Sequence, residues 1–344
     1  MKSPRLACCL VALLGTGMWI LAAPARADCP EFTGSADTPD YANGLAVSGG
    51  YAYVTWDPEG IHGGLRVIDV STPSSPVEVG FVDTAARAWG VAVSGDYAYV
   101  ANHLDGLRVI DVSTPSAPVA VGLVDFPGAA RGVAVSGGYA YVAADFDGGL
   151  RVIDVSTPST PVVVGYVNTP GYAIGVAVAA GYAYVADWTS GLRVIDVSTP
   201  SAPWEVGFID TQGAYGVALS GGYAYVADAT FGLRVIDVST PSAPVELGYV
   251  NTPGDCRGVA VSGRYVYVAD WTGGLRVIDV STPSAPVVVG YADTPGWARG
   301  VALSGGHVYI AAWDAGLAVY EDCSLPFSDG FESGDTSAWS ATVP

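Results

Sequence analysis

The chain has 344 residues, 50% of them hydrophobic, and carries 33 acidic against 14 basic side chains, which gives a net charge of −19 at pH 7. Nucleic acids and anionic membrane surfaces are bound through basic surfaces, so a chain this acidic is expected to bind neither.

Residues 1–27 predict a secretory signal peptide. Lys2 and Arg5 precede an apolar run over residues 6–23, and the sequence ARA gives a small-x-small cleavage site directly before Asp28. A retained membrane anchor is the alternative, but glycine and threonine interrupt the run and a cleavage site ends it. We therefore expect a mature chain that is not inserted in the membrane and is secreted or held in the cell envelope, in the periplasm or at the cell surface.

Cleavage at this site leaves 11 basic residues, all of them arginine, against 33 acidic ones, a net charge near −22. The absence of lysine from this part excludes Schiff-base chemistry and P-loop phosphate binding, which need that amine. Three of the five cysteines remain, namely Cys29, Cys256 and Cys323. In an exported protein we expect one pair of them to be oxidised and one cysteine to be left over.

A ten-residue sequence motif recurs through the rest of the chain. The sequence GLRVIDVSTP occurs six times without change, starting at Gly64, Gly106, Gly149, Gly191, Gly232 and Gly274, and a seventh copy from Gly316 reads GLAVYEDCSLP. Successive starts lie 41 to 43 residues apart. A fixed period of this length indicates a repeated supersecondary unit.

Each unit predicts four short strands, shown here in chain order for the fifth copy. The runs are GVALSGG from Gly216, YAYVADA from Tyr223, GLRVIDV from Gly232 and PVELGYVNT from Pro244. They are rich in valine, isoleucine, leucine and tyrosine, and none shows helical spacing. SGG predicts a tight hairpin between the first two strands, and STPSAP a rigid turn between the third and fourth. Four antiparallel strands in about 40–45 residues are typical of a β-propeller blade.

The two ends of the repeat region favour a closed ring over an open solenoid of stacked coils. Residues 31–39 (EFTGSADTP) align with residues 287–295 (VVVGYADTP) and form a lone fourth strand, while the last copy lacks a fourth strand. We therefore predict an all-β, seven-bladed β-propeller of four-stranded antiparallel blades over residues 28–323. In this prediction the N-terminal strand joins the last blade and closes the ring.

The cysteines fit this closure. Cys323 aligns with Ser281 and Cys29 with Ala285, the residues that flank the proline turn between the third and fourth strands of the sixth copy. The chain is not continuous at that turn in the closing blade, so we predict a Cys29–Cys323 disulfide in its place. Cys256 stands where other copies carry alanine, which favours a small buried filler over a reactive thiol.

The unit GLRVIDVSTPSAPVEVGFVDTPG…GVAVSGGYAYVAD resembles the LVIVD-repeat proteins, which are exported bacterial β-propellers, over residues 31–322. The resemblance implies the propeller fold and an extracytoplasmic location, and it implies no particular reaction. Residues 324–344 form a polar, acidic tail outside the repeat. SDGFESGDTSAWS in this tail resembles a short C-terminal module of assorted exported bacterial proteins, which suggests sorting, and a disordered terminus is the open alternative.

One face of the predicted propeller varies between copies and the other does not. The second-to-third and fourth-to-first connections emerge on one face around the central channel, and they collect tryptophan, tyrosine and arginine. We call this the variable face. The opposite face carries the SGG and STPSAP turns, which scarcely change, and we call it the turn face. Tryptophan, tyrosine and arginine dominate binding hot spots because they combine contact area with a polar handle.

The candidate ligand-binding residues on the variable face are Trp56, Trp89, Arg131, Trp188, Arg257, Trp271, Trp297, Arg299 and Trp313. A second interpretation remains open, in which each aromatic side chain covers the end of its own blade. The arginines are not periodic and fit a functional role better than the periodic tryptophans do. The aspartate before each VSTP is predicted to cap the following turn.

The motif search predicts neither catalysis nor a cofactor. The sequence has no HExxH, no paired-cysteine zinc spacing and no nucleophile-elbow context, and DFDGG lacks the remaining ligands of a calcium loop. We expect no metal and no other cofactor. The leading hypothesis is an exported, monomeric, non-enzymatic scaffold that presents the variable face to a protein or glycan partner. The alternative is an extracellular polysaccharide hydrolase or lyase that uses carboxylates at the channel mouth.

Overall fold

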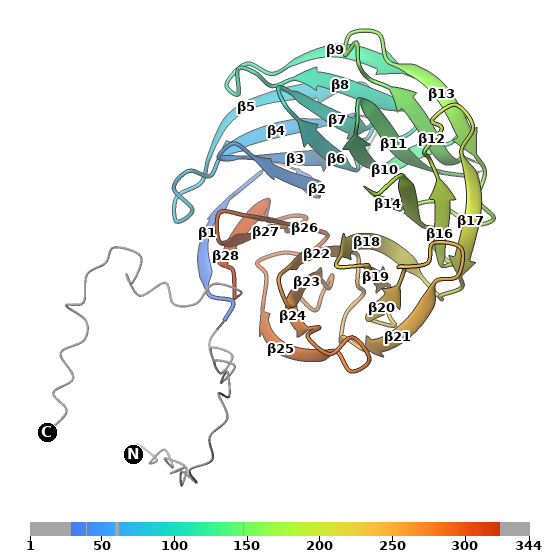
Figure 1. The fold of residues 1–344 in the computed structure, drawn as a ribbon. Helices are drawn as coiled ribbons and strands as arrows, with labels where there is room; N and C mark the ends of the chain where they lie inside the picture. The colour runs from blue at the N-terminus through green and yellow to red at the C-terminus, as the bar shows by residue number, and fades with distance from the viewer. Residues whose placement is uncertain (1–28, 39, 59–61, 147, 324–344) are drawn as a thin grey trace, which may run out of the picture.

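The computed structural model describes residues 29–38, 40–58, 62–146 and 148–323, and in them it confirms a seven-bladed β-propeller without helices. Accordingly, these residues contain no helix long and apolar enough to cross a membrane. The predicted signal peptide and the C-terminal tail lie outside the described residues and stay predictions. Figure 1 shows the blades following one another around a common axis in chain order.

Each blade is a four-stranded antiparallel sheet, and in the first six blades the four strands follow one another in sequence. Blade 1 holds β2 (Tyr41–Ser48), β3 (Tyr51–Asp57), β4 (Gly63–Asp69) and β5 (Val77–Thr84). Blade 2 holds β6 (Val91–Ser94), β7 (Tyr97–Ala101), β8 (Leu107–Asp111) and β9 (Val119–Val124). Blade 3 holds β10 (Ala129–Ser136), β11 (Tyr139–Asp145), β12 (Gly149–Asp154) and β13 (Val162–Val167). Blade 4 holds β14 (Gly175–Ala179), β15 (Tyr182–Ala186), β16 (Leu192–Asp196) and β17 (Trp204–Ile209).

Blade 5 holds β18 (Ala214–Ser220), β19 (Tyr223–Asp228), β20 (Leu233–Asp237) and β21 (Val245–Val250). Blade 6 holds β22 (Gly258–Ser262), β23 (Tyr265–Ala269), β24 (Leu275–Asp279) and β25 (Val287–Ala292). Blade 7 holds β26 (Gly300–Ser304), β27 (His307–Ala311), β28 (Leu317–Glu321) and β1 (Phe32–Ala36). The first strand of each blade, which we call the inner strand, contacts the inner strands of both neighbouring blades, and β26 contacts β2, so the ring is closed.

The core lies between blades rather than within them. In β11, Ala140 and Val142 pack toward blade 2, while Tyr141 and Ala143 pack toward blade 4. Successive side chains of a strand point to opposite faces of the sheet, and here both faces are buried by a neighbouring blade. This explains why the YAYVA runs contain no polar residue: every position of such a strand faces a core.

Ring closure occurs at the predicted place. Strand β1 pairs antiparallel with β28, and the Cys29–Cys323 disulfide joins the two ends of the ring across 294 residues of sequence. In the other blades the STPSAP turn packs against a glycine of the preceding outer strand. A β-carbon on Gly248, for example, would lie 2.8 Å from the Pro283 carbonyl oxygen. The corresponding Gly290 faces the carbonyl oxygen of Cys29, so the disulfide-linked segment takes the place of the missing turn.

The turn aspartates cap as predicted. Asp69, Asp111, Asp154, Asp196, Asp237 and Asp279 each accept a hydrogen bond from the backbone N–H of the serine two residues on, at 2.8 to 2.9 Å. The serine hydroxyl and then this N–H hold the pKa of Asp154 and Asp196 below its ordinary value. The aspartates therefore fix the start of each turn on the turn face.

Loss of the disulfide is expected to destabilise the ring. The variant C29S/C323S should unfold at lower denaturant concentration than the parent, with a loss of up to about 5 kcal/mol because the cross-link closes a very long loop in the unfolded chain. Urea unfolding of both proteins followed by circular dichroism measures the difference. Cys256→Ala, which restores the alanine of other blades, is the matched control and should scarcely shift the midpoint. Equal midpoints for parent and C29S/C323S would contradict the closing role.

Acid is expected to remove the contribution of the capped aspartates. A carboxyl with a lowered folded pKa stabilises the fold above its unfolded pKa and loses that contribution as pH falls through the folded pKa. The variant D154N/D196N keeps an acceptor oxygen but cannot titrate. The parent should therefore melt above the variant at about pH 6, and the gap should shrink toward about pH 3. Comparing the two proteins cancels the relief of charge repulsion among the carboxylates that they share, and a gap that stays constant would refute the prediction.

Candidate functional site

The inner strands approach one another so closely at the axis that each carries a glycine there. A β-carbon on Gly90 would lie 2.6 Å from the carbonyl oxygen of Arg131, and one on Gly258 would lie 2.7 Å from that of Arg299. Real β-carbons essentially never come this close to another heavy atom, so only glycine fits without moving the neighbouring blade. The residue before each glycine is consequently placed at an equivalent position around the axis in every blade.

These seven preceding residues line one cavity of about 340 Å³, which we call the mouth cavity. They are Asn43, Trp89, Arg131, Ile174, Tyr215, Arg257 and Arg299. The wall is completed by Asp145, Tyr172, Trp188 and three glycines. Tyr172 and Trp188 come from the connections of the variable face, so the cavity lies at that end of the channel.

Three arginines of the mouth cavity stack against aromatic rings. The Arg257 guanidinium carbon lies 3.8 Å from the ring centroid of Trp271 and 4.9 Å from that of Tyr215. Arg131 stands 4.2 Å from Trp89. Cation–π contact of this kind holds a guanidinium in place and leaves its N–H edge available to a ligand.

Arg299 is held in the same way. Its guanidinium carbon lies 3.9 Å from the ring centroid of Trp313 and 4.8 Å from that of Trp271. It also donates a hydrogen bond to the side-chain oxygen of Asn43. Two tryptophans and one amide therefore fix its orientation.

The arginines differ in how their charge is compensated. Arg131 forms an ion pair with Asp145 at 2.9 Å, and Arg257 one with Asp255 at 2.9 Å. Within the described ranges, Arg299 forms no ion pair, and its Nε is buried without an acceptor. Burial first, and then repulsion by Arg257, lowers the pKa of Arg299 to about 10. The group stays protonated at neutral pH, and the nearby Asp57 carboxylate attracts it without forming an ion pair with it. It therefore adds a positive charge without an ion-pair partner to the cavity of an acidic protein.

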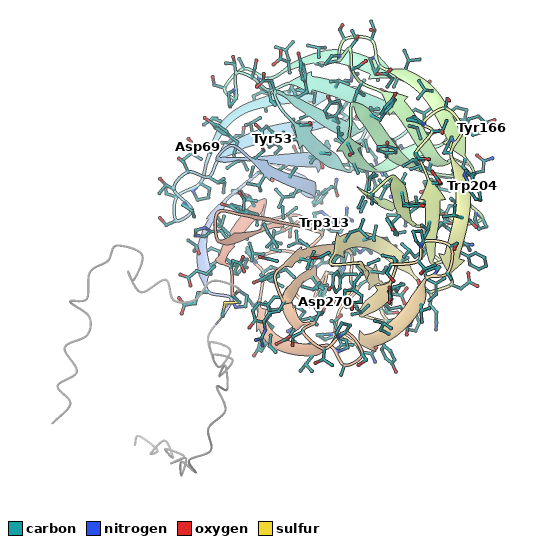
Figure 2. All side chains as sticks on the ribbon, in the orientation of Figure 1. Tyr53, Asp69, Tyr166, Trp204, Asp270 and Trp313 are labelled. Atoms are coloured by element: carbon teal, nitrogen blue, oxygen red, sulfur yellow. A yellow bond between two sulfur atoms is a disulfide. The ribbon has the colours of Figure 1, made fainter. Side chains whose placement is uncertain are left out.

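Aromatic rings form a collar around this charge. On one side, Phe146, Tyr172, Trp188 and Tyr215 are linked by successive ring contacts of 5.3 to 6.5 Å. On the other side, Trp271, Trp297 and Trp313 contact one another at 4.6 to 4.9 Å, and Trp313 contacts Tyr41 at 5.0 Å. Arg257 connects the two sides, since it stacks on both Tyr215 and Trp271. Figure 2 places Trp313 beside the axis, and Tyr166 and Trp204 on the outer rim.

The backbone that presents the collar is unusual. Trp188, Trp271 and Trp313 have φ of 45°, 49° and 36°, in the left-handed region that bulky residues rarely occupy. Backbone bridges to the next blade hold all three. Trp188 exchanges two hydrogen bonds of 3.0 Å with Ala214, Trp271 does the same with Ala298 at 3.0 and 3.1 Å, and the Trp313 carbonyl accepts one from the Ala42 N–H at 2.9 Å. The equivalent bridge in blade 5 joins Ala229 to Cys256. Cys256 is buried as predicted, and burial raises its pKa well above the ordinary value.

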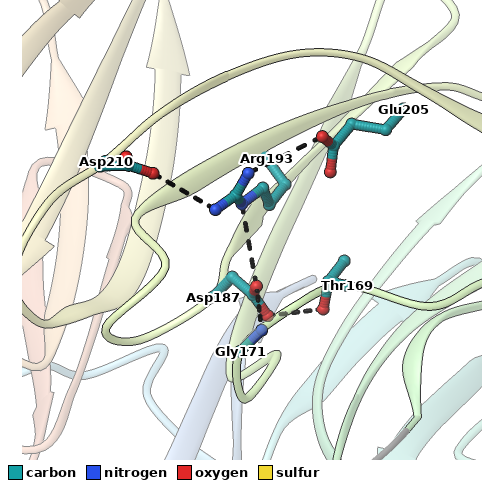
Figure 3. A network of polar contacts seen from close by, with 6 residues as sticks. All are labelled: Thr169, Gly171, Asp187, Arg193, Glu205 and Asp210. Atoms are coloured by element: carbon teal, nitrogen blue, oxygen red, sulfur yellow. Dashed lines mark hydrogen bonds and ion pairs between the residues drawn. The ribbon is translucent and has the colours of Figure 1, made fainter.

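Most other charged groups near this face are structural. Asp187, fully buried, accepts hydrogen bonds from the Thr169 hydroxyl at 2.6 Å and from the Gly171 N–H at 2.8 Å, and it faces Arg193 at 3.9 Å (Figure 3). Arg193 also faces the carboxylates of Glu205 and Asp210. Burial raises the pKa of Asp187. These contacts join the connection into blade 4 to the loop after β15. Both oxygens of the Asp187 carboxylate accept hydrogen bonds within the protein.

The structure brings eight of the nine predicted site residues to one region. Five of them line the mouth cavity, namely Trp89, Arg131, Trp188, Arg257 and Arg299. Trp271, Trp297 and Trp313 belong to the collar beside it. Trp56 is apart: it is buried in blade 1 under the Arg66 guanidinium, 4.9 Å away, and does not line the cavity. Its position fits the alternative interpretation, an aromatic side chain that covers its own blade.

Five side chains of the cavity wall are absent from the nine predicted site residues: Asn43, Asp145, Tyr172, Ile174 and Tyr215. Asn43 and Ile174 precede the inner-strand glycines of their blades, and this position carries a signal that could have found them. It alternates among asparagine, tryptophan, arginine, isoleucine and tyrosine while the glycine beside it never changes. In the described residues, no group of three or more histidine, cysteine, aspartate or glutamate side chains is placed to hold a metal ion.

Fold and site together define a closed seven-bladed propeller with an arginine- and aromatic-lined channel mouth. The chain belongs to the LVIVD repeat family, which confirms the resemblance of the repeat unit. The family's repeat matches residues 39–84, 85–125, 127–169, 170–211, 213–252, 253–294 and 295–320. None of the curated proteins matches the sequence.

Two solved structures illustrate the similarity in fold. The computationally designed Ika8 protein superposes with a TM-score of 0.61 at 12% identity, over 85% of this chain and 99% of that chain. BamB from Moraxella catarrhalis superposes with a TM-score of 0.56 at 15% identity, over 84% of this chain and 85% of that chain. At these identities the likeness shows the fold alone.

Removal of the Asp187 carboxylate is expected to destabilise the fold. In Asp187→Ala the Thr169 hydroxyl and the Gly171 N–H lose their buried acceptor, which should cost about 1–3 kcal/mol of unfolding free energy. Asp210→Asn, which alters an exposed partner of the same arginine, is the control and should change stability by less than about 0.5 kcal/mol. Urea unfolding measures both, and an Asp187→Ala protein as stable as Asp210→Asn would contradict the structural role.

Proposed function

We propose that the protein is a non-enzymatic binding scaffold whose variable face takes up a protein or glycan partner outside the cytoplasm. The observation that carries the proposal is the convergence of three arginines and the aromatic collar at one end of the ring. The other end consists of repeated, aspartate-capped turns. Propellers commonly serve as interaction scaffolds, because the rigid ring presents variable connections from all its blades on one side.

The arrangement supports recognition for a physical reason. The guanidinium groups are already oriented by their stacking on tryptophan and tyrosine, so a partner would not have to order them on binding. Aromatic and arginine side chains packed around a recess are the residue types in which binding energy concentrates. The Cys29–Cys323 disulfide supports an oxidising compartment, where an exported protein would meet such a partner.

Hydrolysis of a polysaccharide finds less support in the same cavity. Glycoside hydrolysis by the common route needs two carboxyl groups across the scissile bond. Among the described residues that line the mouth cavity, Asp145 is the only carboxylate. Its oxygens accept from Arg131 at 3.0 Å and from the Phe146 N–H at 2.8 Å, so it is held in structural contacts. This observation favours binding over hydrolysis.

Capture of a partner tests the proposal. The full chain, produced with its own N-terminal segment, is immobilised and exposed to an envelope extract of the native host and to a glycan array. The parent should retain a partner that the variant W188A/W271A/W313A does not retain. Trp204→Ala is the matched control, because Trp204 is 59% exposed on the outer strand β17 and lies on the outer rim, away from the axis (Figure 2).

Circular dichroism establishes that all three proteins are folded. Equal retention by the parent and the triple variant would contradict binding through the variable face. Loss of retention in Trp204→Ala alone would move the binding surface to the outer rim. Release of sugar products from any glycan on the array would contradict the non-enzymatic part of the proposal.

A further inference from the structure

The mouth cavity combines three features that together specify a ligand class. It holds an oriented guanidinium without an ion pair, apolar aromatic surfaces, and a carboxylate that can accept hydrogen bonds. We infer that the cavity binds the carboxylate-bearing ring of a uronic acid, presented at the end or on a side branch of a glycan. This inference rests on the proposed function and names the chemical class of its ligand.

The charge of the cavity points to an anion. Arg131 and Arg257 each have one carboxylate partner, whereas Arg299 shares its donors only with the Asn43 amide among the described residues. The Arg299 guanidinium is half-buried beside two other guanidiniums, and their repulsion is relieved when an anion enters. Because the cavity excludes part of the surrounding water, attraction to that anion is stronger than at an open surface.

The geometry of the arginine points to a carboxylate among the anions. A guanidinium presents five N–H donors in a planar fork, which matches the two oxygens of a carboxylate. Stacking between Trp313 and Trp271 fixes the plane of the Arg299 fork, and one hydrogen bond to Asn43 leaves donors over. The buried Nε of Arg299 and the buried indole Nε1 of Trp89 both lack an acceptor within the described part of the chain.

The rest of the wall points to a sugar ring rather than to a small inorganic anion. Tyr172, Trp188 and Tyr215 offer ring surfaces on which the C–H face of a pyranose can lie. Asp145 in the same wall repels any anion, but its carboxylate has lone pairs beyond those used by Arg131 and Phe146 and can accept hydrogen bonds from sugar hydroxyls, which sulfate lacks. A volume of about 340 Å³ is at the small end of ligand cavities, so it takes a group of this size and not the face of a folded domain.

The charge of the whole chain restricts the ligand further. With 33 acidic against 14 basic residues, the protein repels a long polyanion at low ionic strength. One carboxylated ring that enters the cavity meets local positive charge, while a continuous polyuronate would also meet the acidic surroundings. The inferred ligand therefore carries its carboxylate on an isolated ring of an otherwise neutral glycan.

Titration with matched sugars tests the inference. The full chain is titrated with the methyl glycosides of glucuronic and galacturonic acid, followed by calorimetry and by the fluorescence of the cavity tryptophans. Methyl glucoside and methyl galactoside provide the same rings without the carboxylate, and acetate and sulfate provide the charge without the ring. At least one uronoside should bind, its affinity should fall with salt, and the four controls should not bind at the same concentration.

Two substitutions locate the binding. Arg299→Gln keeps a hydrogen-bond donor but removes the charge, and it should weaken uronoside binding about tenfold or more. Trp188→Ala should weaken it as well. Arg264→Gln is the matched control, because Arg264 is an arginine on the turn face that pairs with Asp279, and it should bind as the parent does.

Several outcomes would overturn the inference. They are no uronoside binding by the folded parent, equal binding of the neutral glycosides, equal binding of acetate or sulfate, and unchanged affinity in Arg299→Gln. If the envelope extract still yields a partner that the triple tryptophan variant loses, the proposed function stands and only the ligand class is wrong. If neither uronoside nor partner is bound, both fail.

Discussion

Backbone contact around the propeller axis is the constraint on which the rest of this structure depends. Seven inner strands meet so closely that a β-carbon on Gly258 would collide with the carbonyl group of Arg299, and the other inner-strand glycines are confined in the same way. Glycine is therefore required at one position of every blade. The residue before it is held beside the axis, yet its side chain points into the mouth cavity and can vary without disturbing the ring. The close approach of the inner strands at the axis therefore determines both the closure of the ring and the position of the candidate site.

The repeated sequence made the fold predictable because every blade shows the same succession of strand and turn residues. Alternation of YAYV and GLRV with glycine and proline turns predicts strands, and the spare strand at residues 31–39 predicts closure. The cysteines could be paired because the aligned copies show which turn is missing in blade 7. The same alignment explains the unvaried aspartates, which cap turns, and Cys256, which replaces a buried alanine in a bridge between blades.

The site was less predictable, because its membership depends on contacts between blades that no single unit contains. Trp56 and Trp188 both follow the YAYV strand of their copies, at positions that differ by one residue. Trp56 is buried under Arg66 in its own blade, while Trp188 lies at the cavity in a left-handed backbone conformation. Asn43 and Ile174 belong to no recognisable binding motif in the sequence. They line the cavity because each precedes an inner-strand glycine. The arginines were identifiable as departures from the repeat, but only the structure shows that Arg299 has no ion-pair partner among the described residues.

Polar groups near the variable face thus divide into two kinds. Carboxylates such as Asp187 are fully hydrogen-bonded and buried, and they stabilise the connections between blades. Arg299 is oriented by stacking and forms no ion pair among the described residues, and it is the group whose charge a ligand would balance. The most direct test is a crystal structure of the protein with a bound methyl uronoside. The account predicts density for the carboxylate beside the Arg299 guanidinium and for the sugar ring against the cavity aromatics. Density only on the turn face or outer rim, or an empty cavity at saturating sugar, would contradict it.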